Sequence, residues 1–300
     1  MKTARKRILI TGGSGYTGRH AFNYAMNSGM EVTCIGRKLD EQDTEIANHF
    51  IACNLHDLDH INQLMKQYQP DYVLHLAGFN DAALSWTSPH SCLTTNVVGT
   101  LNLLEALRNH SPSSRSLIIG SALQFQPHIE NPPHPYSLSK TMQVLLSEAW
   151  RDLFSLDIKV AKPSNLIGPG PSNGICSIIA RKITAAECSG GSIDIHIDNG
   201  LDQRDFIDIR DVVDAYFKIL TAETRQMFFE IGSGTSRTMK EMMSYYKGLT
   251  EQPFTVNYKQ MKAASPVKTD LTAIQSIGWT PSYSLHTSLK DTLSYQRSQI

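Results

Sequence analysis

The sequence has little charge imbalance and no apolar run long enough to cross a membrane. Lys and Arg together number 28, as do Asp and Glu, so the formal net charge is zero. Balanced charge argues against a broad phosphate-backbone footprint, and so against nucleic acid as a partner. The basic start from Met1 to Arg7 runs into an apolar segment too short for a signal peptide or a membrane span. We therefore expect a soluble, cytoplasmic protein with no membrane partner.

Paired cysteines are also missing. The five cysteines are widely separated and form no Cys-x-x-Cys pair and no Cys/His cluster with zinc spacing. We therefore expect neither a disulfide framework nor a metal site. The sequence contains no internal repeat or low-complexity tract, and with 41% hydrophobic and 19% charged residues it predicts a folded, core-forming chain.

What is present in the first half is an alternation of short β-branched runs with longer amphipathic runs. Expected strands are Arg7–Thr11, Glu31–Ile35, Phe50–Asn54, Tyr72–Ala77, Ser116–Ser121 and Ile158–Lys162, and expected helices are Thr17–Ser28, Leu58–Tyr68, Thr94–Asn109 and Ser137–Phe154. This pattern predicts an α/β fold with a doubly wound parallel sheet of the Rossmann type. The carboxyl ends of its strands share one ligand-binding edge.

The alternation breaks up beyond Asn165, around the Gly/Pro-rich "GPGPSNG" at 168–174. We therefore expect a dinucleotide-binding domain over 1–165 and a smaller C-terminal substrate lobe over 166–300. Segments near 205–232, with a helix at Arg210–Thr221 and a strand at Met227–Ile231, are expected to return to the first layer.

The segment "TGGSGYTGRH" places Gly12, Gly15 and Gly18 between the first strand and the first helix. Glycines there permit a tight turn and let backbone N–H groups approach a pyrophosphate at the helix N-terminus. A loop that needs only tight packing is the alternative interpretation. The position after the first strand of a βαβ unit favours the dinucleotide.

The second strand ends in "CIGRK", without the carboxylate that commonly binds the ribose 2′-hydroxyl of NAD. Arg37 and Lys38 could instead pair with a 2′-phosphate, so we expect NADP(H) to be preferred, with NAD(H) possible. The alternative is that both are solvated loop residues. Asn54 could meet the adenine edge, or simply end its strand.

In "HPYSLSK", Tyr136 and Lys140 lie four residues apart at the start of a helix and so share one face. We expect the ammonium to favour the phenolate and to lower the pKa of the phenol. Ser121, at the end of its strand, could hold a substrate carbonyl beside the phenol, or be an ordinary strand-end serine. The three residues together are predicted to deliver a proton to a carbonyl oxygen.

These motifs occur in order with "HLAG" at 75–78, "TNVVGTLNLLEA", "NLIGPG" from Asn165, "RDFIDIRDVVDAY" from Arg204 and "IGWTP" from Ile277. In this order, over nearly the whole chain, the sequence resembles the extended short-chain dehydrogenase/reductases, the NAD-dependent epimerase/dehydratase group. Within that group it is most similar to GDP-4-keto-6-deoxy-D-mannose reductases and related nucleotide-4-keto-6-deoxysugar reductases. Those enzymes act in polysaccharide biosynthesis.

The resemblance implies an oxidoreductase with Ser121, Tyr136 and Lys140 as its catalytic residues, and it implies where the ligands bind. The cofactor would contact Gly12, Gly15, Tyr16, Thr17, Gly18, Arg37, Lys38, Asn54, Leu55, Leu76, Ala77, Gly78, Asn96, Tyr136, Lys140 and Pro163. A sugar nucleotide would contact Asn80, Ser121, Asn165 and Arg204, the arginine through the diphosphate. The alternative for Arg204 is a structural ion network with Asp205 or Asp208.

Three activities remain open at this point. Ala122, Leu123 and Gln124 stand where sugar-nucleotide dehydratases of the group carry acidic residues, which disfavours dehydration. Arg37 favours an exchangeable NADPH, and therefore a 4-keto reductase, over an NAD-retaining 4-epimerase. A non-catalytic dinucleotide-sensing protein is the third alternative.

The segment between Ser121 and Tyr136 is short for the group, which leaves GDP- and UDP-linked sugars both open. Two of the expected helices, Thr94–Asn109 and Ser137–Phe154, carry apolar residues beyond a single stripe. The resemblance implies that they pair in a homodimer, and burial against the sheet is the alternative.

Overall fold

The computed structural model describes residues 5–40 and 43–300 of the chain. The chain forms two compact units. The first runs to Lys162 and takes up Tyr216–Phe229, and the second comprises Pro163–Ala215 and Glu230–Ile300. The sequence predicted a domain boundary near residue 165 and a segment near 205–232 that returns to the first domain. In the structure the boundary follows Lys162, and the returning segment is the shorter Tyr216–Phe229.

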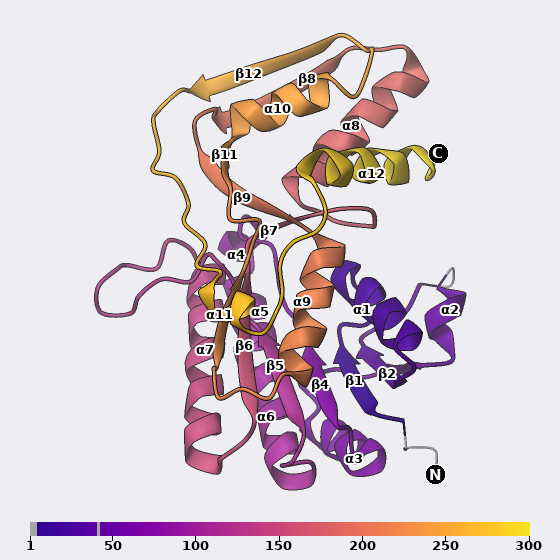
Figure 1. Cartoon of the computed structure of the whole chain (residues 1–300), viewed down its shortest axis with the longest axis vertical. Helices are drawn as coiled ribbons and strands as arrows, with labels where there is room; N and C mark the ends of the chain where they lie inside the picture. The colour runs from indigo at the N-terminus through magenta and orange to yellow at the C-terminus, as the bar shows by residue number, and fades with distance from the viewer. Residues whose placement is uncertain (1–4, 41–42) are drawn as a thin grey trace. The chain divides into compact units, whose positions relative to one another are not determined.

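The first unit is built on a seven-stranded sheet with strand order β10-β6-β5-β4-β1-β2-β3 (Figure 1). All strand pairs from β3 to β6 are parallel. The strands are β1 Arg7–Thr11, β2 Glu31–Gly36, β3 Phe50–Ala52, β4 Tyr72–His75, β5 Arg115–Ile119, β6 Ile158–Pro163 and β10 Phe228–Ile231. The predicted doubly wound α/β sheet is confirmed, and its order reverses between β1 and β4, where such sheets bind ligands.

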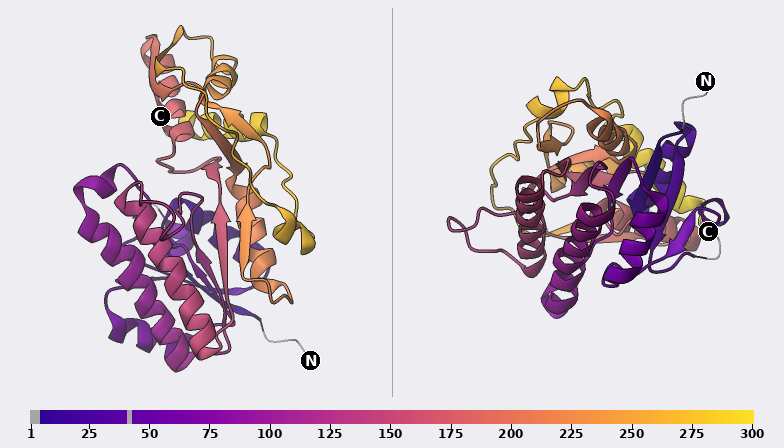
Figure 2. Two further views of the ribbon diagram at one scale, coloured as in Figure 1. Left: turned by 90° about the vertical axis from the view of Figure 1, so that its left-hand side faces the viewer. Right: turned by 90° about the horizontal axis from the view of Figure 1, so that it is seen from below.

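Helices connect these strands and cover the sheet. They are α1 Tyr16–Asn27, α2 Thr44–Ala47, α3 Leu58–Tyr68, α4 Leu84–Thr87, α5 Pro89–Leu93, the π-helix η1 Thr94–Val98, α6 Gly99–His110 and α7 Pro135–Phe154. Figure 2 shows α6 and α7 running beside each other along the sheet. Helix α9, Ile209–Thr221, enters the first unit with its last residues, where Phe217 stacks on Tyr24 of α1 with ring centroids 4.4 Å apart.

The sequence of β1 explains why the sheet is central. Ile8, Leu9 and Ile10 are all at most 1% exposed although successive side chains point to opposite faces, so both faces of the strand are covered. Leu9 belongs to an apolar cluster in which Leu64, Leu103 and other residues of α3 and α6 pack under the sheet. Burial on both sides holds the carboxyl ends of β1 and β4 in fixed positions.

Three expected strands end two residues earlier than predicted, at Ala52, His75 and Ile119. After His75 the chain leaves the ladder because the N–H of Ala77 donates to the side chain of Thr11, at 3.0 Å, instead of to a neighbouring strand. The residues beyond these ends therefore form the loops at the carboxyl edge.

The second unit contains two smaller sheets, β11-β9-β7 and β12-β8. Their strands are β7 Asn165–Ile167, β8 Ile193–Asn199, β9 Gln203–Asp208, β11 Ser236–Thr238 and β12 Phe254–Gln260. The helices are α8 Ile175–Ser189, α10 Met239–Lys247, α11 Thr272–Ser276 and α12 Leu285–Arg297. A core of apolar residues from α8, β8, α10 and α12 holds the unit together. In the described part of the chain, no helix has the length and apolarity needed to span a membrane.

Candidate active site

The glycine-rich loop lies between β1 and α1 and is shaped by close backbone contacts. Gly12 has φ of +71°, and a Cβ there would lie 2.8 Å from the backbone nitrogen of Ala77. A Cβ on Gly18 would lie 2.7 Å from the Cα of Gly13, because the first turn of α1 packs directly on the loop. Only glycine fits either position without moving backbone.

The N-terminus of α1 carries no side-chain cap. Its N-cap residue is the exposed Gly15, and no acidic residue occurs in the first turn, which includes Tyr16 and Thr17. An uncapped helix N-terminus presents N–H groups and a positive dipole end to a bound anion. The loop and helix therefore have the form that a pyrophosphate requires.

Two basic residues follow β2. Arg37 and Lys38 are exposed, and neither takes part in an ion pair within residues 5–40 and 43–300. Asn54 is exposed in the turn after β3, where its side chain accepts from the N–H of His56 at 3.2 Å. Leu55 beside it is buried at 8% exposure. The two cations are available to a phosphate at the carboxyl end of β2.

Helix α7 begins where the sequence places its start signals. The side chain of His134 is the N-cap and accepts from the N–H of Ser137 at 2.9 Å, and Pro135 occupies the first helical position. A proline there has no N–H to leave unpaired. This start brings Tyr136 into the first turn with its backbone N–H donating to Ser85.

The side chains of Ser121 and Tyr136 lie close enough for the serine hydroxyl to influence the phenol. Ser121 lies two residues beyond β5 and accepts from the N–H of Leu123 at 3.1 Å. This contact holds the serine oxygen in place and leaves its proton for the phenol or for a substrate oxygen. The structure therefore brings the predicted serine and tyrosine together.

Burial raises the pKa of Tyr136, and the hydrogen bond from Ser121 opposes the rise only in part. The expectation that Lys140 would lower this pKa is wrong. The physical reason is that Tyr136 is 8% exposed, so the loss of water around its phenolate outweighs the favourable contacts. The phenol is therefore protonated at neutral pH, which is the state of a proton donor.

Lys140 lies one helical turn after Tyr136 and is 6% exposed. Its ammonium donates to the backbone carbonyl of Ile119 at 2.8 Å and to the side-chain oxygen of Gln143 at 2.9 Å. Burial lowers the pKa of Lys140 to about 8. Both contacts hold the amine at the carboxyl end of β5.

The loop after β4 carries several of the residues predicted to contact the cofactor. Leu76 and Ala77 are half-buried, whereas Gly78 and Asn80 are exposed. Asn96 is fully buried, contrary to the expectation that it contacts the cofactor directly.

The amide of Asn96 is committed to protein partners. Its oxygen accepts from the N–H of Phe79 at 2.7 Å, and its nitrogen donates to the carbonyl of Phe79 at 2.9 Å and to Ser139 at 2.8 Å. Asn96 thus fixes the loop after β4 to helix α7.

The predicted residues Pro163, Asn165 and Arg204 belong to the second unit. The amide of Asn165 on β7 donates to the backbone carbonyl of Asp205 at 2.9 Å, which ties it to β9. Arg204 pairs with Asp202 at 2.9 Å, and both side chains are 40% exposed. A pair this exposed contributes little stability and leaves the guanidinium open to another anion.

An ion network of Arg204 with Asp205 or Asp208 is not formed. The buried carboxylate of Asp205 instead accepts from Ser233, Gly234 and Thr269. Asp208 is occupied by Arg210 and Ser288.

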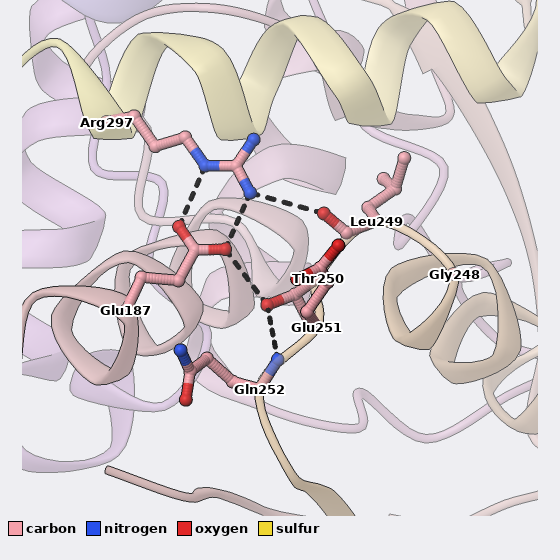
Figure 3. A pocket seen from close by; sticks show the side chains of 7 residues that line it. All are labelled: Glu187, Gly248, Leu249, Thr250, Glu251, Gln252 and Arg297. Atoms are coloured by element: carbon pink, nitrogen blue, oxygen red, sulfur yellow. Dashed lines mark hydrogen bonds and ion pairs between the residues drawn. The ribbon is translucent and has the colours of Figure 1, made fainter. Parts of the chain in front are cut away.

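A surface pocket of about 480 Å³ is formed entirely by the second unit (Figure 3). Its central feature is an ion pair in which Arg297 donates twice to Glu187, at 2.8 and 2.6 Å. Thr250 also donates to Glu187, and Arg297 reaches the carbonyl of Leu249. The charged groups satisfy one another and fasten α12 to α8, and none of them is a predicted site residue.

No role was predicted from the sequence for three buried residues that are connected to Lys140 by hydrogen bonds. Gln143 contacts Lys140 directly, and Thr100 and His75 continue the contact into the interior. A signal for Gln143 was present, because residues three apart on a helix share a face. Nothing local connects Lys140 with Thr100 or His75, since 40 and more positions separate them along the chain.

The residues on this edge fit a nicotinamide dinucleotide: a glycine loop after β1 that a Cβ would fill, an uncapped helix N-terminus, and a lysine and tyrosine near the carboxyl end of β5. The chain belongs to the NAD dependent epimerase/dehydratase family, whose model matches residues 8–232. Members of this family depend on a nicotinamide dinucleotide, so the protein is an NAD(P)-dependent enzyme.

Several relatives are distant in sequence but align over nearly the whole chain. The GDP-6-deoxy-D-mannose reductase of Pseudomonas aeruginosa is 26% identical, with 98% of each chain covered. A UDP-glucose 4-epimerase from Mycolicibacterium smegmatis is 24% identical over 98% of this chain and 99% of its own. Among solved structures, the UDP-glucose 4-epimerase of Thermotoga maritima with UDP-glucose superimposes with a TM-score of 0.85 at 22% identity, covering 98% of this chain and 99% of its own.

Proposed function

We propose that the protein is an NADPH-dependent reductase that converts the 4-keto group of a nucleotide-activated 4-keto-6-deoxyhexose, GDP- or UDP-linked, into a hydroxyl. The observation that carries this proposal is the protonated, buried phenol of Tyr136 beside the hydroxyl of Ser121. Reduction needs an acid that protonates the developing alkoxide, and a phenol with a raised pKa is in that form at neutral pH.

The roles of the protein groups follow from their contacts. The bound dinucleotide would supply the hydride that adds to the carbonyl carbon. Ser121, held by the N–H of Leu123, orients the carbonyl oxygen toward the phenol. Tyr136 then donates its proton to that oxygen, and the ammonium of Lys140 stabilises the phenolate that remains.

The residues after Ser121 support reduction over dehydration. Gln124 is the only polar side chain among 122–124, and its amide makes long contacts of 3.4 Å with the N–H of Ser121 and the carbonyl of Lys140. An amide cannot act as a general acid or base at neutral pH. The exposed Arg37 and Lys38 support NADPH over NADH, and the full-length likeness to a GDP-6-deoxy-D-mannose reductase supports the sugar class.

The test is to mix the purified protein with NADPH and 4-keto-6-deoxy sugars linked to GDP, UDP or dTDP, and to follow the absorbance of the reduced nicotinamide. We expect stoichiometric oxidation of NADPH with at least one of them. Failure with all three, by protein that binds NADPH, would overturn the proposal.

A second candidate is a sugar-nucleotide 4-epimerase, favoured by the likeness to UDP-glucose 4-epimerases over nearly the full chain. An epimerase returns its hydride to the substrate and so retains NAD. The nucleotide released when the purified protein is denatured distinguishes the two, together with interconversion of UDP-sugars without added reductant.

We also propose a homodimer formed through α7. Met142, Leu145, Leu153 and Phe154 on this helix leave between 39% and 71% of their side chains exposed. Light scattering during size-exclusion chromatography should give twice the chain mass of 33.4 kDa. A Leu145→Glu, Leu153→Glu double variant should give a monomer, and a monomeric wild-type protein would contradict the proposal.

A further inference from the structure

A line of buried polar side chains leads from Lys140 into the interior of the first unit. It consists of Lys140, Gln143, Thr100, His75 and Thr11, none of which is more than 6% exposed. They come from helices α7 and α6 and from strands β4 and β1. Buried polar groups are costly unless they are hydrogen-bonded, so a continuous line of them calls for a reason.

Every neighbour in the line is within hydrogen-bond distance. Lys140 donates to the oxygen of Gln143 at 2.9 Å, and the nitrogen of Gln143 donates to the Oγ1 of Thr100 at 2.9 Å. The Nε2 of His75 lies 2.9 Å from the same Oγ1, and its Nδ1 lies 2.8 Å from the hydroxyl of Thr11.

The hydrogen positions follow from Thr100. Its hydroxyl proton goes to the backbone carbonyl of Asn96 at 2.7 Å, so its oxygen must accept from both Gln143 and His75. His75 therefore carries its proton on Nε2, and its Nδ1 accepts from Thr11. The N–H of Ala77 fills the acceptor side of Thr11.

These hydrogen bonds fix the orientation of the side-chain amide of Gln143. If the amide were flipped, its NH₂ group would face the ammonium of Lys140, and its oxygen would face a hydroxyl oxygen whose proton is already donated elsewhere. The first contact would then lack an acceptor, and the second would lack a proton. The carbonyl end of Gln143 is thus held toward Lys140.

His75 stays neutral, so its Nδ1 remains an acceptor and the hydrogen bonds along the line keep their direction. Burial, with a smaller contribution from the charge of Lys140, lowers the pKa of His75 to about 3. The titratable groups near Lys140 include the phenol of Tyr136, one helical turn before it, and the buried thiol of Cys92 on α5, which lies 3.3 Å from Ser139 and interacts with Lys140.

Within residues 5–40 and 43–300, one N–H of the Lys140 ammonium has no hydrogen-bond acceptor. Ile119 and Gln143 accept two of its three N–H groups. Gly78 borders the ammonium, and a Cβ at that position would lie 3.7 Å from Nζ and 3.0 Å from the Oδ1 of Asn96. A side chain at this position would therefore touch the amine and crowd Asn96, and glycine avoids both contacts.

We propose that Gln143 is a positioning residue that directs the remaining N–H of Lys140 toward the cofactor and the Tyr136 phenol, and that Thr100 and His75 hold its amide in that orientation. This inference rests on the proposed function for its consequence in turnover. The contact itself can be tested without turnover.

The experiment measures the titration of Lys140 in the full chain without cofactor. Lysine isotopically labelled at the ε-carbon reports protonation by nuclear magnetic resonance, and Lys140→Met identifies the signal. Gln143→Leu removes the acceptor of a charged donor and should move the midpoint of Lys140 down by about 1 on the pH scale. Gln143→Glu keeps an acceptor and adds a negative charge, so it should move the midpoint up.

Matched variants separate positioning from folding. Thr100→Val removes the hydroxyl that holds the amide and should shift Lys140 in the same direction as Gln143→Leu, whereas Thr100→Ser should restore it. Ser147→Ala is the control, because Ser147 is also buried on α7 and donates to the backbone carbonyl of Gln143 at 2.8 Å but lies outside the line. It should leave the midpoint unchanged.

Dinucleotide binding and turnover extend the test. Gln143→Leu should weaken NADPH binding, followed by its fluorescence, and lower kcat/KM by about 10- to 100-fold at pH near 8. Movement of the Lys140 midpoint in the same direction in both Gln143 variants, or no movement in either, overturns the inference. If the Gln143 variants do not fold, an unchanged midpoint in Thr100→Val overturns it instead. If the wild-type protein fails to oxidise NADPH with every 4-keto sugar tested, only the proposed function is refuted. The titration of Lys140 does not depend on turnover.

Discussion

Replacing His75 by glutamine should make the stability of the protein less sensitive to acid. Glutamine can accept from Thr11 with its oxygen and donate to Thr100 with its nitrogen, which are the two hydrogen bonds that the neutral imidazole makes. It cannot take up a proton. The variant therefore removes the titration while preserving the polarity of the contacts.

The size of the effect follows from the pKa of His75. Burial lowers this pKa from 6.5 to about 3 in the folded protein, so the unfolded chain binds a proton that the folded protein rejects. The stabilising contribution is complete above the unfolded value of 6.5 and is lost as the pH falls toward about 3. Between about pH 7.5 and about pH 5 this linkage removes about 2 kcal/mol of unfolding free energy.

The assay is urea unfolding at both pH values for the wild type and His75→Gln. The other histidines and the carboxylates are common to both proteins and cancel when the two pH-induced changes are subtracted. We expect the wild type to lose about 2 kcal/mol more than the variant. Equal losses in the two proteins would refute a neutral, buried His75, and with it the hydrogen positions assigned to its neighbours.

Three further outcomes are expected. Tyr136→Phe should lower turnover by about 10²- to 10⁴-fold while NADPH still binds, as measured by steady-state kinetics and fluorescence titration; full activity would remove the phenol from the mechanism. Arg37→Ala should weaken NADPH binding by about 10- to 100-fold with little effect on NADH, and equal losses for both cofactors would contradict a 2′-phosphate contact. Gly18→Ala should lower the unfolding free energy by about 1–3 kcal/mol and abolish dinucleotide binding, because the added methyl group meets the backbone of the loop. Gly29→Ala, at φ of +74° with nothing within 4 Å, should cost only about 1 kcal/mol and leave binding intact, so matching affinities in the two variants would speak against the cradle.

The relation between sequence and fold was closest in the first unit. Apolar runs such as Ile8–Ile10 and amphipathic helices such as α3 carry their structure in local periodicity, so the parallel sheet and most helix bounds could be predicted. Strand ends were less predictable. The chain leaves β4 at His75 because of a bond from Ala77 to Thr11, 66 positions away, which no local pattern encodes.

The second unit shows the same limit more strongly. Its strands β7, β9 and β11 are three to six residues long and pair across separate parts of the chain. Segments this short carry too little periodicity to identify from sequence, and their edges are set by long-range contacts such as those of Asp205 with Ser233 and Thr269.

By itself, the sequence determined the types of residue at the site and the order in which they occur: the three glycines, the basic pair after the second strand, and the tyrosine and lysine on one helical face. Only the tertiary structure decided their chemical state. The phenol of Tyr136 is protonated because the fold removes water from it, and Lys140 is directed by Gln143 because helices and strands distant in the chain meet behind it. Desolvation and hydrogen-bond geometry depend on every neighbour in space, whereas the sequence specifies directly only the neighbours along the chain.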